Sequence, residues 1–217
     1  MKIFTKKEII LLIIIGLSLA VGAYLYPNLP ERVPSHWNFQ GEIDGWSSRN
    51  FSVFFFPLFI LGVYLLMTFI PLIDPLRKNY EKFRNVYFGF KLILVLFFVS
   101  LYVYSLLAGI GVRTNMNYFI LPAISIMLIA MGIFLPRIKR NWFVGIKTPW
   151  TIHSDEVWEK THRLGGRLFI IAGAISLGSI LIADFAFAIT IASILTAAFV
   201  PVIYSYFIFR RMGKFEK

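Results

Sequence analysis

The sequence contains no cysteine, and only 15% of its 217 residues carry a charge. The lack of cysteine excludes disulfides, thiolate metal sites and cysteine nucleophiles, although it does not indicate a compartment. The low charge is more informative, because 58% of the residues are hydrophobic and a soluble domain of this size needs a mostly polar surface. The composition therefore predicts a membrane protein with several spans.

Six apolar runs are long enough to cross a hydrocarbon core of about 30 Å as helices. We expect the first to remain uncleaved, because its apolar region is longer than that of a usual signal peptide. Small residues from Ala20 to Ala23 leave a cleavable signal as the alternative. The predicted fold class is all-α, a polytopic integral membrane protein with six transmembrane helices. The predicted spans are residues 9–26, 51–73, 86–111, 118–135, 168–183 and 187–209.

The formal net charge of +11 is distributed according to membrane topology. Of the 22 lysines and arginines, 19 lie in segments that alternating spans place on one side, and only Arg32, Arg49 and Arg113 lie on the other. The positive-inside rule then predicts that both termini are cytoplasmic. Topology and attraction to anionic membrane lipids together explain the basic net charge, so we predict no direct binding of nucleic acid.

The chain is expected to have three parts. Residues 1–135 hold the first four helices and an extracellular loop at 27–50, and residues 168–217 form a helical hairpin with a basic tail. Residues 136–167 form a cytoplasmic loop with an interfacial helix. Ser154 is the predicted N-cap of that helix, which should bend at Gly165-Gly166 into the fifth span.

The membrane interior offers little for transport. No Asp, Glu, Arg or His lies near the middle of a predicted span, and Lys91 is expected to reach back to the headgroups. A small exporter stays open as an alternative, with a pore lined by Ser100, Tyr102, Tyr104 and Ser105. Small residues predict that the last two spans pack closely, through Ala172, Ala174, Ser176 and Gly178 on one and Ala188, Ala192 and Thr196 on the other.

The extracellular loop reads LPERVPSHWNFQGEIDGWSSR, Leu29 to Arg49. Alternating residues and turn signals at Gly41 and Asp44-Gly45 predict a short hairpin on the membrane face, anchored by Trp37 and Trp46. In one interpretation the tryptophans are interfacial belt residues and Asp44 orders its own turn. In the other, His36, Asp44 and the tryptophans form an outward recognition surface.

Two pairs of residues in the loops allow a metal or catalytic interpretation. Glu159 and His162 form an E-x-x-H pair with His153 nearby, but no second helix supplies matching ligands, which favours a solvated or ion-paired helix face. His36 and Asp44 lack an accompanying nucleophile motif. A membrane enzyme or metal protein is therefore an alternative only, and we predict no cofactor.

Two stretches resemble a known family. The outer motif LPERVPSHWNFQGEIDGW resembles the amino-terminal domain of unknown function of SdpI-type membrane proteins, and NWFVGIKTPWT with EVWEKTHRLGGR resembles their carboxy-terminal signature. The resemblance implies a non-enzymatic immunity protein of the bacterial plasma membrane, which protects a toxin-producing cell from its own secreted killing peptide. It also implies a receptor that holds a cytosolic winged-helix autorepressor at the membrane when the toxin is bound.

The resemblance also implies residue roles. Lys147 departs from the arginine expected in the family, which puts a bidentate contact there in doubt. All five tryptophans and all three histidines lie in the outer and inner loops, so we expect the outer loop to meet the toxin or shield the lipid it attacks, and the inner loop to bind the partner. The implied toxin-binding residues are Pro34, His36, Trp37, Asn38, Gly41, Asp44 and Trp46; the implied partner-binding residues are Asn141, Gly145, Lys147, Thr148, Pro149, Trp150, Trp158, Thr161, His162 and Arg163, followed by a matching Gly166.

Overall fold

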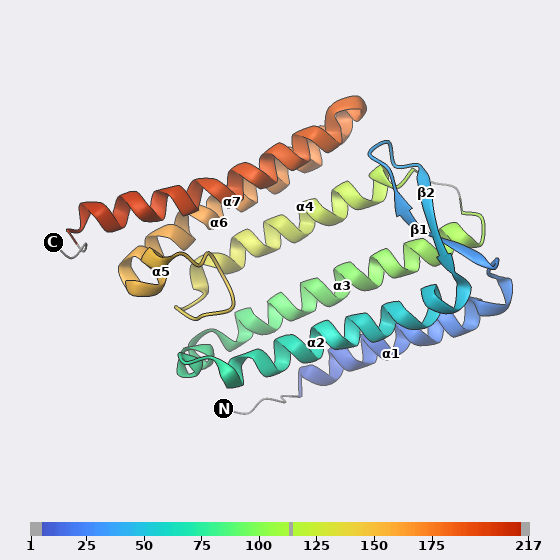
Figure 1. The fold of residues 1–217 in the computed structure, drawn as a ribbon, viewed down its shortest axis with the longest axis horizontal. Helices are drawn as coiled ribbons and strands as arrows, with labels where there is room; N and C mark the ends of the chain where they lie inside the picture. Colours follow the sequence, from blue (N-terminus) through green and yellow to red (C-terminus); the bar gives the residue numbers. More distant parts are fainter. Residues whose placement is uncertain (1–5, 113–114, 214–217) are drawn as a thin grey trace. The chain divides into compact units, whose positions relative to one another are not determined.

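A computed structural model describes residues 6–112 and 115–213. Lys2, Arg113 and residues 214–217 of the basic tail lie outside this described part. Within it, six helices are long and apolar enough to cross a membrane, which confirms the predicted number of spans (Figure 1). They are α1 (Glu8–Leu25), α2 (Phe56–Ile73), α3 (Arg84–Gly109), α4 (Asn117–Phe134), α6 (Asp155–Gly178) and α7 (Ala186–Arg211).

The chain divides into two compact units. We call Lys2–Thr68 with Lys91–Ala123 the hairpin unit, and Phe69–Phe90 with Ile124–Lys217 the loop unit. Helices α2, α3 and α4 each contribute residues to both units. Each unit is described by itself below.

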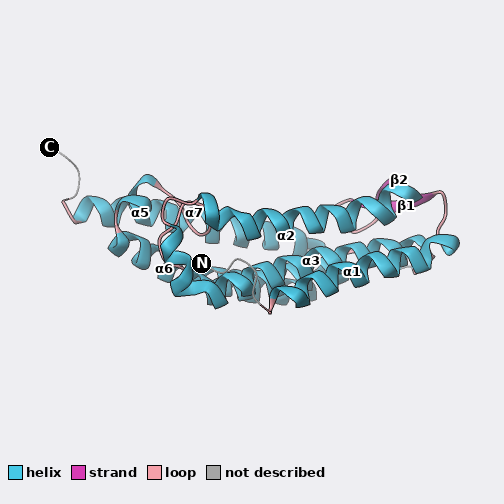
Figure 2. Ribbon diagram, turned by 90° about the horizontal axis from the view of Figure 1, so that it is seen from below, coloured by secondary structure: helices cyan, strands magenta, loops and turns pink. Residues whose placement is uncertain are grey.

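The hairpin unit carries the two strands of the described residues, which Figure 2 shows in magenta. β1 (Arg32–Trp37) and β2 (Ile43–Ser48) pair antiparallel, so the predicted hairpin is confirmed. The 3₁₀ turn η1 (Tyr26–Asn28) leads into it, and the π-helical turn η2 (Phe51–Phe55) leads out into α2. A buried cluster joins the hairpin to α3 and η2: Leu29, Val33, Val53, Tyr102 and Leu106.

The expectation that Lys91 reaches the headgroups is wrong. Its ammonium nitrogen lies 2.6 Å from Oε1 of Glu8 on α1, and the two side chains are only 4% and 7% exposed. Thr68 on α2 lies 3.4 Å from the same nitrogen. A buried carboxylate satisfies the lysine within the helix bundle, which removes the reason to reach the membrane surface.

The four residues expected to line a pore have other roles in the hairpin unit. The hydroxyl of Tyr102 donates to the Val53 carbonyl at 3.1 Å, and Ser105 donates to the Pro34 carbonyl at 2.5 Å. Ser100 bonds within its own helix, and the ring of Tyr104 stacks on Phe119. Tyr102, Tyr104 and Ser105 therefore hold α3 to its neighbours.

In the loop unit, α6 and α7 run side by side (Figure 1). The predicted interfacial helix is not separate, because α6 continues through Gly165-Gly166 from Asp155 to Gly178. Ser154 is its N-cap as predicted, accepting a hydrogen bond from the Val157 amide. The connecting segments are η3 (Arg77–Phe83), η4 (Leu135–Arg137), α5 (Pro149–His153), η5 (Ser179–Leu181) and η6 (Ala183–Phe185).

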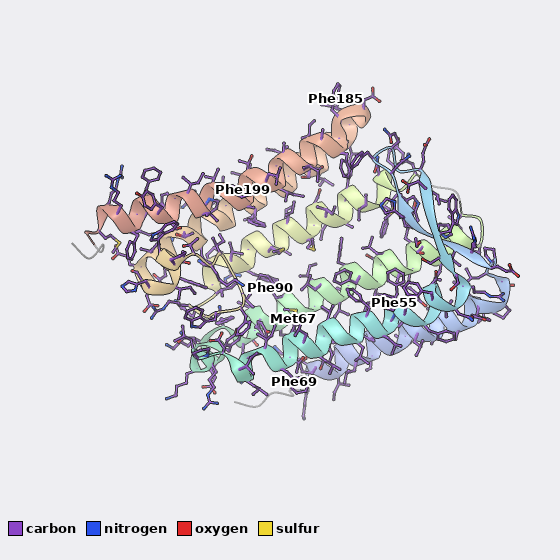
Figure 3. The ribbon with its side chains drawn as sticks, viewed as in Figure 1. Phe55, Met67, Phe69, Phe90, Phe185 and Phe199 are labelled. Atoms are coloured by element: carbon purple, nitrogen blue, oxygen red, sulfur yellow. The ribbon has the colours of Figure 1, made fainter. Side chains whose placement is uncertain are left out.

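The buried small residues of α6 and α7 differ in part from those predicted to pack the two helices together. Ala172 and Ser176 are buried on α6, but Ala174 and Gly178 are exposed. On α7 the predicted Ala188, Ala192 and Thr196 are exposed, and the buried face carries Ala186, Thr190 and Ala197. Phe185 and Phe199 lie on exposed positions, as expected for side chains that face lipid (Figure 3).

Helices α4 and α6 approach so closely that only glycine fits. A Cβ on Gly132 would lie 2.6 Å from the Gly166 carbonyl oxygen, and a Cβ on Gly166 would lie 2.7 Å from the Gly132 carbonyl oxygen. Gly173 meets the Ser125 carbonyl in the same way, at 2.7 Å. The absence of side chains therefore permits backbone contact along this crossing.

Candidate functional site

The hairpin brings His36 and Asp44 together. The pairing register shifts on both sides of His36, which leaves Ser35 on β1 and Asp44 on β2 as extra residues without a direct partner. Such bulges redirect side chains. As a result His36 Nδ1 lies 2.5 Å from Asp44 Oδ1, and both side chains remain exposed.

Gly45 makes this pair possible. It lies opposite His36 in the ladder, where a Cβ would come within 2.8 Å of the His36 Cβ. The prediction that Asp44-Gly45 forms a turn is therefore wrong, because both residues belong to β2. Glycine is required there for close approach between the strands rather than for a turn.

The turn of the hairpin is at residues 38–42, where Gly41 has a positive φ of 78°. The side-chain oxygen of Asn38 accepts from the amides of Gln40 and Glu42, both at 3.0 Å. The Gly41 carbonyl accepts from the Met116 amide at 3.1 Å. Asn38 and Gly41 therefore shape the turn and attach it to the segment before α4.

The two hairpin tryptophans have different environments. Trp37 is half-buried and packs edge-on against Tyr104, with 5.7 Å between the ring centroids. Trp46 is 53% exposed, and Phe39 at the turn is also exposed. Trp37 therefore anchors the hairpin to α3 through Tyr104, whereas Trp46 presents an indole outward.

The seven outer residues thus fall into two sets. Pro34, Trp37, Asn38 and Gly41 hold the hairpin in place. His36, Asp44 and Trp46 are exposed on its surface. Only this second set offers side chains that an external molecule can contact.

In the loop unit, Asn141 is completely buried and organises the inner loop. Its side-chain oxygen accepts from the amides of Phe143 and Val144, at 2.9 and 2.7 Å. Its side-chain nitrogen donates to the carbonyls of Lys139 and Val144, both at 2.9 Å. Each polar atom of the amide therefore fixes the loop backbone, which leaves none to bind a partner.

His162 has both ring nitrogens engaged inside the protein. Nε2 accepts from the Ile146 amide at 3.0 Å, so Nδ1 carries the proton and donates to the Trp158 carbonyl at 2.8 Å. The ring stacks on Trp158 at 4.0 Å. Gly145, with φ of 113°, passes directly over Nε2, where a Cβ would collide with the ring.

The same contacts argue against a metal pair at Glu159 and His162. Nε2 is already an acceptor, and the Glu159 carboxylate lies 3.2 Å from the Lys139 ammonium. His153 packs against Phe209 on α7. Within the described residues no group of three or more His, Asp or Glu side chains is placed to hold a metal ion.

The remaining inner residues mostly support the loop. Thr148 caps α5 in a reciprocal arrangement with Thr151, and its hydroxyl lies 3.0 Å from that of Ser205 on α7. Trp150 packs edge-on against Tyr206, at 5.1 Å between centroids. Trp158 donates from Nε1 to the Ile138 carbonyl at 2.8 Å, and Thr161 is fully buried. Of the ten implied partner-binding residues, Lys147, Pro149 and Arg163 are the exposed ones.

Sequence reasoning missed Asp74, which is buried and joins two segments of the loop unit. Its carboxylate accepts from the Leu76 amide at 2.7 Å, the Tyr80 hydroxyl at 3.0 Å and the Trp142 amide at 2.9 Å. The Asp-Pro dipeptide before Leu76 indicates a local turn. Nothing in its local pattern indicates the contact with Trp142, 68 residues away.

The fold and these two motifs define a multi-pass membrane protein with a small hairpin on one pair of helices and a tightly bonded loop between two others. Residues 137–205 match the SdpI/YfhL protein family, and residues 13–61 match a domain of unknown function, DUF1648. These matches confirm the resemblance to the SdpI-type membrane proteins.

A curated relative matches almost from end to end. The Immunity protein SdpI of Bacillus subtilis (strain 168) is 26% identical over 209 residues, which cover 96% of this chain and 98% of the relative. No solved structure matches the chain.

Proposed function

We propose that the chain is a membrane immunity protein that acts against a secreted peptide toxin through the hairpin. The observation that carries the proposal is the exposed group of His36, Asp44 and Trp46 on a hairpin whose other motif residues are used to hold it. The end-to-end similarity to the Immunity protein SdpI supports the class of function. The proposal is for a binding protein rather than an enzyme.

The distribution of charge supports an outward-facing hairpin. Its side of the membrane holds 3 of the 22 lysines and arginines, so both termini and the inner loop would be cytoplasmic. A toxin that arrives from outside would then meet the hairpin first.

The chemistry of the exposed group suits a peptide. Tryptophan gives a large rigid contact with one polar hydrogen, and it is common among the residues that dominate binding energy. The Asp44 carboxylate can accept from a peptide amide or a cationic side chain, and its contact with His36 fixes the orientation of both groups. Together they provide one apolar and one polar contact at adjacent positions.

The test is a killing assay in which a sensitive bacterium expressing this chain is exposed to a peptide toxin of the SdpC type. The chain should protect, and Trp46→Ala or His36→Ala should lower the tolerated toxin concentration by about 30-fold, the effect of losing about 2 kcal/mol at a dominant contact. Gln40→Ala is the matched control, because this exposed side chain lies on the same hairpin. Equal protection by all variants at equal membrane levels would contradict the proposal.

A second role is proposed for the inner loop, which would bind a cytosolic winged-helix autorepressor. The specific support is that Lys147, Pro149 and Arg163 stay exposed in a motif whose other residues are mostly bonded or packed inside the protein. Lys147→Ala with Arg163→Ala should impair capture of the repressor on membranes while leaving toxin resistance intact. Trp46→Ala should impair toxin resistance and leave repressor capture intact. Loss of both phenotypes in every variant would contradict separate roles for the hairpin and the inner loop.

A further inference from the structure

Most basic side chains of the inner loop have partners inside the protein. Lys139 pairs with Glu159 and Lys160 with Glu156, at 3.2 and 2.8 Å. Arg140 pairs with Asp155 at 2.8 Å, and Lys147 donates to the Phe143 carbonyl at 2.7 Å. Three arginines of the same stretch remain, all of them exposed and without an ion pair or hydrogen bond to any residue of 6–112 or 115–213: Arg137, Arg163 and Arg167.

The backbone brings these three arginines to one place. A Cβ on Gly166 would lie 2.7 Å from the Pro136 ring, so the chain at Pro136 touches α6 at Gly166. Arg137 and Arg167 follow these two residues directly. Arg163 and Arg167 lie four residues apart on α6, which puts them on one face, one turn from each other.

This arrangement is electrostatically unfavourable without a counterion. Like charges four residues apart on a helix repel each other, and Arg137 adds a third cation from η4, the turn that follows α4. The acidic residues of the adjoining helix surface are already paired with Lys139, Arg140 and Lys160. An anion from outside the chain would balance the cluster.

The surroundings indicate which kind of anion. Ile133 lies four residues before Arg137 on α4, and Ile170 and Ile171 follow Arg167 by one turn on α6; all three are exposed. The arginines therefore lie at the boundary between the polar residues of the inner loop and the apolar spans of α4 and α6. A ligand of this place would need an anionic group beside the arginines and an apolar part along the isoleucines.

We propose that Arg137, Arg163 and Arg167 bind the phosphate of an anionic phospholipid, whose acyl chains lie along Ile133, Ile170 and Ile171. The guanidinium group binds phosphate through two parallel hydrogen bonds, and basic sites between membrane helices recognise lipid headgroups in this way. The glycine crossing of α4 and α6 would hold the arginines at a fixed spacing for the headgroup.

The test is lipid binding to the full chain purified in a nonionic detergent. Native mass spectrometry would count phosphatidylglycerol, cardiolipin and phosphatidylcholine bound to the protein, and inorganic phosphate would be added as a competitor. We expect the two anionic lipids to be retained and phosphatidylcholine to be lost. The triple variant R137Q/R163Q/R167Q should bind the anionic lipids about 100-fold more weakly, given roughly a factor of five for each basic residue at a membrane surface.

The matched control is K139Q/K147Q/K160Q, which removes the same charge from the same stretch and should retain the lipid. Equal loss in both triple variants would show a general charge effect and overturn the proposal. Displacement of the lipid by millimolar inorganic phosphate would indicate a site for free phosphate instead. Retained lipid with lost repressor capture in the arginine variant would assign the cluster to a protein partner. If the triple variant does not fold, R167Q alone should still weaken lipid binding about fivefold, and unchanged binding would overturn the proposal.

Discussion

Replacing Lys91 by methionine would leave the Glu8 carboxyl buried in the hairpin unit without its cation. The carboxylate lies among α1, α2 and α3, and its second oxygen has no hydrogen-bond partner among the described residues. Removing one partner of a buried ion pair leaves the other group buried without compensation. The variant should therefore be much less stable than the parent chain.

Breaking a buried ion pair by removing one partner typically costs about 3–5 kcal/mol of unfolding free energy. The side chains of Lys91 and Glu8 are only 4% and 7% exposed, so solvent screens the pair little and a loss in this range is expected.

The reciprocal change Glu8→Gln should cost a similar amount, because it leaves the Lys91 ammonium buried without its carboxylate. The double variant E8Q/K91M removes both charges and should lie within about 1 kcal/mol of the parent chain.

Chemical unfolding in nonionic detergent, followed by tryptophan fluorescence at one fixed pH, measures all three variants. Single variants that each cost less than about 1 kcal/mol would refute the buried pair. A double variant as unstable as the worse single variant would show that the side chains contribute by packing and not by charge.

Three further predictions concern packing and hydrogen bonding. Gly166→Ala places a methyl group 2.7 Å from a backbone oxygen of α4 and should cost about 1–3 kcal/mol of unfolding free energy. Gly178→Ala is the control, because no atom lies within 4 Å of the added methyl group, and it should be neutral or stabilising. A similar loss in both variants would contradict the close crossing of α4 and α6. His162→Ala removes two buried hydrogen bonds and a stacked ring and should cost about 3 kcal/mol in the same assay; a loss below about 1 kcal/mol would be inconsistent with its burial. Gly41→Ala is incompatible with φ of 78° and should speed hydrogen exchange of the Met116 amide, which bonds to the turn; unchanged exchange would argue against the attachment.

The six spans were predictable because each is an apolar run with its own length and flanking charges. The Ser154 cap and the hairpin were predictable for the same reason, since a cap and a turn depend on a few neighbouring residues. The local sequence pattern was therefore sufficient for features that depend only on the residues of about one helix or one hairpin.

Partnerships between distant residues were not predictable in this way. Glu8 and Lys91 are 83 residues apart, and Asp74 and Trp142 are 68 apart. The bulges that join His36 to Asp44 depend on a register shift, which a simple alternation cannot show. The buried face of α7 was misassigned because the helix has apolar residues all around it. Hydrophobicity therefore does not indicate which of its small residues are buried.

The division of each motif into exposed and internal residues changes what a loss of function would mean. Trp158→Ala would remove a fully buried indole that bonds to the Ile138 carbonyl, so failure to capture a repressor would report a collapsed loop as readily as a lost contact. Lys147→Ala alters an exposed side chain whose one bond is to a nearby carbonyl, and it leaves the loop core untouched. On the hairpin, Trp46 and Gly41 form the same contrast. Only variants of the exposed positions can therefore separate recognition from folding, and in each motif a matched internal variant calibrates the effect of folding alone.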